Sequence, residues 1–93
     1  MNQSDLVEAA QVHLQAARTT LANDRQTDLA ERIRQTADLL AAQSPATYAA
    51  REAVVAILRE LPDATEHPDT RTALRAAEQS LTAALSAQHR AEG

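Results

Sequence analysis

The sequence predicts an all-α protein, a small antiparallel four-helix bundle, and three observations support this prediction. The 93-residue chain has 22 alanines and 11 leucines but one glycine, Gly93, and one aromatic residue, Tyr48. Sheets need β-branched and aromatic residues in their strands and glycines in many turns, so this composition disfavours them. Apolar residues recur at spacings of three and four, the period of an amphipathic helix. Their positions predict helices over residues of about 5–22, 25–42, 45–61 and 70–90.

Length and composition exclude several classes of protein. A chain of 93 residues forms one domain at most, residues 1–93. Cysteine is absent, which excludes disulfides and thiolate metal sites. No glycine-rich loop is available to cradle a phosphate. Nine arginines, with no lysine, face 13 acidic residues for a net charge of -4. This acidic balance argues against nucleic-acid binding, which depends on a basic patch.

The first two predicted helices each carry one apolar stripe. Asp5, followed by Glu8 three residues later, predicts a capping box at the start of the first helix. Asn23 or Thr27 is a candidate cap for the second helix. The stripe of the first helix is Leu6, Ala10, Leu14, Ala17 and Leu21, and that of the second is Leu29, Ile33, Ala37 and Leu40.

The third predicted helix is the most apolar, and we expect it to be central and best buried. The pair Ser44–Pro45 predicts its start, because serine is a preferred N-cap and proline suits the first helical position. Pro62 is expected to end it. Its broad apolar face is Ala50, Val54, Ile57, Leu58 and Leu61, widened by Tyr48 and Val55.

Residues 62–69 form the one longer predicted loop, after which Asp69 or Thr70 is expected to cap the fourth helix. Its stripe is Leu74, Ala77, Leu81, Ala84 and Leu85, and Glu92 and Gly93 are expected to fray. The first and fourth helices share an alanine and leucine pattern at a constant offset of 67 residues. We favour coincidence of composition over duplication, because true repeats sustain their period.

A thin core predicts self-association. The chain has only 19 large apolar residues, and single cores of this size rarely supply more than about 3–5 kcal/mol. Val12 and Leu39 lie off the stripes of their helices and offer a second contact face. The competing interpretation is that isolated apolar residues are normal on a protein surface. We expect a homo-oligomer that uses the first helix.

The leading functional prediction is a non-catalytic interaction protein that presents a helix surface to a protein partner. Its candidate partner-binding residues are Val12, Leu39, Arg32 and Tyr48. Tyrosine is enriched at interfaces, although the place of Tyr48 in the first turn of the most apolar helix favours a core role.

The alternative is a small anionic ligand, such as a nucleotide, bound by arginines at an oligomer interface. Arg18, Arg25 and Arg32 recur at intervals of seven, and guanidinium groups suit phosphate and carboxylate. The competing interpretation pairs Arg32 with Asp28 at i,i+4, and Arg25 with its neighbour Asp24.

The sequence offers little for catalysis. His13 lies at the edge of an apolar stripe, where a boundary role is favoured over phosphotransfer. The Glu-x-x-His motif of di-iron bundles is absent. A solvated loop is favoured over a metal site for the remaining cluster, which comprises Asp63, Glu66, His67 and Asp69. We therefore expect no enzyme, cofactor or metal.

The chain is expected to be a cytoplasmic protein of a bacterium or phage. Residues 1–8 carry acids and no basic segment, unlike a secretory signal. Apolar runs such as residues 53–58 are too short to span a membrane. Arginine without lysine, together with abundant alanine, is typical of a GC-rich genome.

Overall fold

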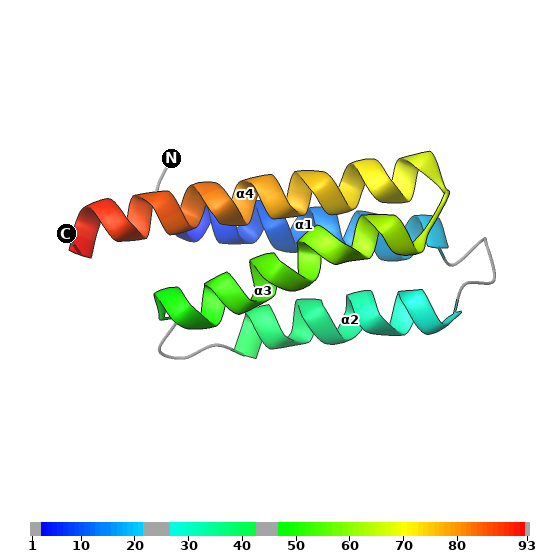
Figure 1. The fold of residues 1–93 in the computed structure, drawn as a ribbon, viewed down its shortest axis with the longest axis horizontal. Coiled ribbons are helices and arrows are strands. Elements are labelled where there is room, and N and C mark those ends of the chain that lie inside the picture. Colours follow the sequence, from blue (N-terminus) through cyan, green and yellow to red (C-terminus); the bar gives the residue numbers. More distant parts are fainter. Residues whose placement is uncertain (1–2, 22–26, 43–46, 93) are drawn as a thin grey trace.

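The structure, a computed structural model, describes residues 3–21, 27–42 and 47–92 and confirms the four-helix bundle. Within those ranges every regular element is helical (Figure 1). The elements are α1 (Gln3–Leu21), α2 (Thr27–Ala42), α3 (Tyr48–Glu60), the short 3₁₀ helix η1 (Leu61–Ala64) and α4 (Pro68–Glu92).

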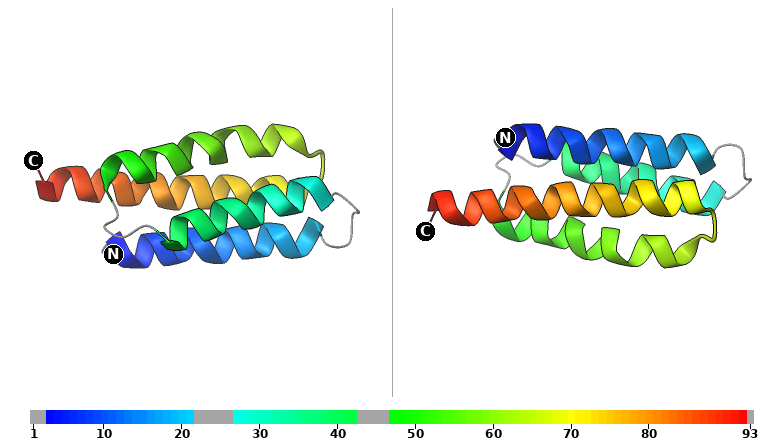
Figure 2. Two further views of the ribbon diagram at one scale, coloured as in Figure 1. Left: turned by 90° about the horizontal axis from the view of Figure 1, so that it is seen from below. Right: turned by 90° about the horizontal axis from the view of Figure 1, so that it is seen from above.

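Consecutive helices run in opposite directions, so the bundle has the predicted up-down-up-down order. α1 packs against both α2 and α4, and α3 lies beside α4 (Figure 2). The particle measures 43 × 21 × 19 Å. The 25 residues of α4 span about 37 Å at 1.5 Å per residue, so α4 sets the long axis.

The first and last helices form the tightest pair, which we call the α1–α4 seam. Alanine exposes one methyl group, so alanines at facing positions let two helix axes approach closely. The seam is fully buried at Ala10, Leu14, Ala17, Ala77, Leu81 and Ala84. The predicted stripes of both helices are thereby confirmed. The seam contains the buried part of the pattern that the two helices share, whereas Ala16 and Ala83 of that pattern are exposed.

The prediction that the third helix is central is wrong. α1 and α4 pack together more extensively than α3 packs on either neighbour, and α2 and α3 are the least closely packed neighbours. The physical reason is length and residue size. α3 has only 13 residues before η1, whereas α1 and α4 interlock over many turns through small side chains.

Two predicted helix starts need correction. α1 begins at Gln3, so Asp5 lies inside its first turn instead of capping it, where its charge favours the positive end of the helix dipole. α3 begins at Tyr48, and Thr47 caps it by accepting the N–H of Ala50 at 3.1 Å. The predicted Ser44–Pro45 start lies outside the described residues, as does Asn23.

The predicted loop 62–69 is partly helical. Pro62 lies inside η1, where a missing N–H is tolerated in the first turn. α4 begins at Pro68, ahead of the predicted caps Asp69 and Thr70. His67 caps it instead, because its Nδ1 accepts the backbone N–H of Thr70 at 3.3 Å. At the other end α4 remains helical through Glu92, where fraying was expected.

A search of the described residues for a membrane-spanning helix found none with the necessary length and apolarity.

Candidate functional site

A cleft opens between α2 and α3, where neighbouring helices pack least closely. Its volume is about 290 Å³. It is lined by Arg32, Gln35, Thr36, Leu39 and Ile57. We call it the α2–α3 cleft.

Helical periodicity explains why these residues meet. Arg32 and Leu39 are seven residues apart, so they share one flank of α2, roughly 10 Å apart along the axis. Thr36 lies between them and is buried, and its hydroxyl donates to the carbonyl of Arg32 at 2.8 Å. Ile57 is half-buried on the facing flank of α3. The cleft thus has an apolar end at Leu39 and Ile57 and a cationic end at Arg32.

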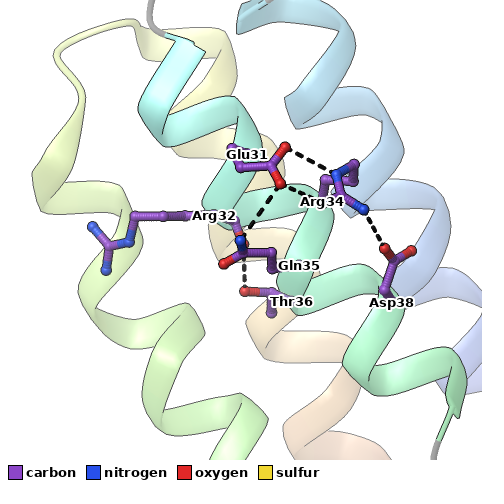
Figure 3. Close-up of polar contacts among 6 residues, drawn as sticks. All are labelled: Glu31, Arg32, Arg34, Gln35, Thr36 and Asp38. Atoms are coloured by element: carbon purple, nitrogen blue, oxygen red, sulfur yellow. Dashed lines mark hydrogen bonds and ion pairs between the residues drawn. The ribbon is translucent and has the colours of Figure 1, made fainter.

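Arg32 holds its charge without a protein counter-ion. Within the described residues its guanidinium makes no hydrogen bond or ion pair, and its side chain extends from α2 toward α3 (Figure 3). The predicted ion pair with Asp28 is therefore not formed. The i,i+4 spacing permits that pair, but the side chain of Arg32 is directed into the α2–α3 cleft.

The next arginine along the helix is fully engaged. Arg34 forms hydrogen-bonded ion pairs with Glu31 and, at 2.7 Å, with Asp38 (Figure 3). The hydrogen bond from Arg34 lowers the pKa of the Glu31 carboxyl, aided by the nearby charges of Arg34 and Arg18. The same contacts raise the pKa of Arg34. The carboxylates of Glu31 and Asp38 are thus both paired with Arg34. Arg32 therefore remains available to a ligand.

The predicted arginine set is only partly described. Arg18 is exposed on α1, close enough to Glu31 to act on its pKa, and it does not line the α2–α3 cleft. Arg25 lies outside the described residues. Arg32 is the member of the set that lines the cleft, so a site combining these arginines across two chains stays a prediction.

The predicted partner-binding residues fall in three places. Arg32 and Leu39 lie together in the α2–α3 cleft, with Leu39 47% exposed. Val12 lies on α1 and is 66% exposed. Tyr48 is half-buried against the core, with its ring 6.2 Å from that of His89.

Three residues of the cleft were not predicted as site residues: Gln35, Thr36 and Ile57. Ile57 was assigned to the core face of its helix, and it is half-buried there. In the structure it lies about 90° from the centre of the buried stripe of α3, at 100° per residue, and so at the edge of the core face.

A smaller hollow of about 190 Å³ lies against η1 and α4. Arg59 and Glu78, which line it, form an ion pair at 3.1 Å, so opposite charges already meet at its wall.

The acidic cluster at residues 63–69 is the second place where the sequence offers groups for chemistry. Among the described residues, no three His, Asp or Glu side chains converge as a metal site would require. His13 is half-buried on α1.

Comparisons of the chain with protein-family models, with curated proteins and with solved structures found no significant match. The chemistry of the α2–α3 cleft therefore carries the functional argument. Its walls offer apolar side chains, one amide and one guanidinium. These groups suit recognition of an apolar side chain that has a carboxylate nearby.

Proposed function

We propose that the protein is a non-catalytic helical interaction module, and that the α2–α3 cleft binds a helix of a protein partner. One observation carries the proposal. The guanidinium of Arg32, which has no counter-ion among the described residues, lies beside the exposed Leu39 and the half-buried Ile57 in one cleft.

A partner helix fits this cleft better than an extended segment does. The cleft is bounded by two helices, and an amphipathic helix places apolar anchors at i, i+3, i+4 and i+7 along such a groove. Extended peptides bind to the edges of sheets or to grooves lined by aromatic residues. The described residues contain no strand, and the chain has one aromatic residue. Burying Leu39 fully supplies up to about 2 kcal/mol, since half of its surface is already covered. An acid paired with Arg32 fixes the direction of the bound helix.

Two matched variants of α2 test the proposal. A protein captured from extracts of the source cells is purified and titrated into the isotope-labelled chain. We expect amide signals of Gln35, Leu39 and Ile57 to move in the NMR spectrum. We also expect Leu39→Arg to weaken binding at least about tenfold. Ala41→Arg adds the same charge on an exposed position of the same helix outside the cleft, and it is expected to have little effect.

The proposal is wrong if the moving signals map to α4, or if the two arginine variants weaken binding equally. The alternative function, a nucleotide-like anion held by Arg18, Arg25 and Arg32 at an oligomer interface, makes a different prediction. A thermal shift with one ligand of a nucleotide panel, abolished by Arg18→Ala, would support that alternative over protein binding.

A further inference from the structure

We infer that the α2–α3 cleft is filled by α1 of a second copy of this chain, with Val12 against Leu39 and Ile57 and Glu8 beside Arg32. The inference rests on the proposed function, because it names the helix that the cleft binds. It also assigns a role to the most exposed large apolar side chain of the described residues.

The outer face of α1 carries an exposed apolar side chain next to a small residue, as a helix that binds in the α2–α3 cleft needs. Val12 and Leu39 are the two exposed large apolar side chains in the described part of the chain. At 100° per residue, Val12 points roughly 170° away from the centre of the stripe that α1 buries. Ala16, exposed one turn later, leaves room for a close approach. Val12 is therefore an apolar side chain that the other helices of its own bundle leave exposed.

Charge complementarity selects the orientation. Glu8 is exposed one turn before Val12 and makes no ion pair within the described residues. When Val12 meets Leu39 and the visiting α1 runs parallel to α2, Glu8 lies on the same side as Arg32. The axial separation is about 6 Å from Val12 to Glu8 and about 10 Å from Leu39 to Arg32. The long arginine side chain spans the difference.

A symmetric cleft-to-cleft dimer fits less well. It would bring the Arg32 guanidinium groups of two copies to the same interface. The nearby acids Glu31 and Asp38 are already engaged with Arg34 and cannot neutralise them. The α1-to-cleft contact is instead heterologous, because it joins two different surfaces, and such contacts build rings or open chains.

Sedimentation velocity on complementary variants tests the contact. We expect the wild-type chain to associate at concentrations of about 10 µM to 1 mM, because a contact made by a single helix buries a small area. Val12→Arg and Leu39→Arg should each be monomeric. A mixture of the two should form a one-to-one complex and nothing larger, because one variant keeps an intact cleft and the other an intact α1. Ala41→Arg, the control, should associate as the wild type does.

A charge exchange tests the orientation. Glu8→Arg and Arg32→Glu should each weaken association about tenfold, and the double variant should recover to within about threefold. Circular dichroism checks that every variant is helical. The inference is overturned if the mixture of Val12→Arg and Leu39→Arg stays monomeric, or if the charge exchange recovers nothing.

Two further outcomes separate this inference from the proposed function. Association that survives Val12→Arg but not Leu39→Arg would show cleft-to-cleft pairing and overturn the α1 assignment. A wild-type chain that stays monomeric at about 1 mM would overturn self-association. The proposed function would still stand or fall by the NMR titration with a foreign partner.

Discussion

Thr20 and Thr70 join α1 to α4 through their hydroxyl groups, whose oxygens lie 2.6 Å apart. The hydroxyl of Thr20 donates its one proton to the carbonyl of Ala17 at 2.8 Å, so Thr70 is the donor between the two threonines. Thr70 is fully buried. One end of the α1–α4 seam is thus closed by a directed chain of hydrogen bonds from α4 into the backbone of α1.

Removing the buried hydroxyl should destabilise the bundle. Thr70→Val deletes the donor to Thr20 at a fully buried position, and we expect a loss of about 1–2 kcal/mol in the free energy of unfolding. The control is Thr19→Val, since the exposed Thr19 bonds only within its own helix, to the carbonyl of Gln15. Urea denaturation measures both variants. Equal losses would show that the bond between the helices adds nothing.

The alanines of the α1–α4 seam should not tolerate enlargement. Ala84→Leu forces a larger side chain into a fully buried position, with an expected loss of about 1–3 kcal/mol. Its neighbour Ala83 is exposed on the same helix, so Ala83→Leu should change stability by less than about 0.5 kcal/mol. Thermal and urea denaturation provide the comparison. A tolerated Ala84→Leu would mean that the seam is loosely packed.

Arg51 connects three helices, and its loss should cost more than the loss of a surface arginine. Its guanidinium donates to Oε1 of Gln3 at 2.9 Å and of the buried Gln88 at 2.8 Å. Arg51→Met keeps the apolar stem and removes the donor to a buried amide, so we expect a loss of about 1–3 kcal/mol.

Arg59→Met is the matched control for Arg51→Met. Arg59 is 65% exposed in its ion pair with Glu78, and such pairs contribute about 0–1 kcal/mol. Both variants are compared by urea denaturation. Similar losses would show that the contacts of Arg51 with the two glutamines do not stabilise the fold.

The ion pairs on the outer face of α2 predict a pH-dependent contribution from Glu31. The hydrogen bond from Arg34 lowers the pKa of this carboxyl, so folding favours its charged form. The contribution is complete above the unfolded pKa of about 4.3, and it is lost as the pH falls through the lowered folded pKa.

The Glu31→Gln variant should therefore be less stable than the wild type at neutral pH, by a small amount because the pair is exposed. The difference should shrink in acid, as the pH falls below the unfolded pKa of the Glu31 carboxyl. Glu52→Gln, at an exposed position on α3 with no ion pair among the described residues, is the control substitution. A difference that persists in acid would contradict the prediction.

The sequence predicts buried faces well because the period of apolar residues directly reports which side of a helix meets the core. Leu14, Ile33 and Leu81 are examples, each fully buried as predicted. Helix starts are harder, since several consecutive residues are able to cap. At α4 the sequence offers Asp69 and Thr70, but Pro68 already suits the first turn, and this leaves the cap to His67.

The candidate site is predicted only in part, for a related reason. Arg32 and Leu39 stand off the stripe of α2, which marks them as available from sequence alone. Whether a cleft lies beside them depends on how closely α3 packs on α2, and that depends on how both helices pack on α1 and α4. The sequence around Ile57 does not report the separation of α2 and α3.

The α1–α4 seam also orders events during synthesis. Its two sides lie far apart along the chain, and Thr20 and Thr70 alone are separated by 50 residues. As the chain leaves the ribosome, α1 emerges first and α4 last of the four helices. The apolar stripe of α1 is therefore fully covered only after α4 has been synthesised and has packed against it. Because contacts distant in sequence slow folding, this bundle should fold later and more slowly than a bundle closed by neighbouring helices.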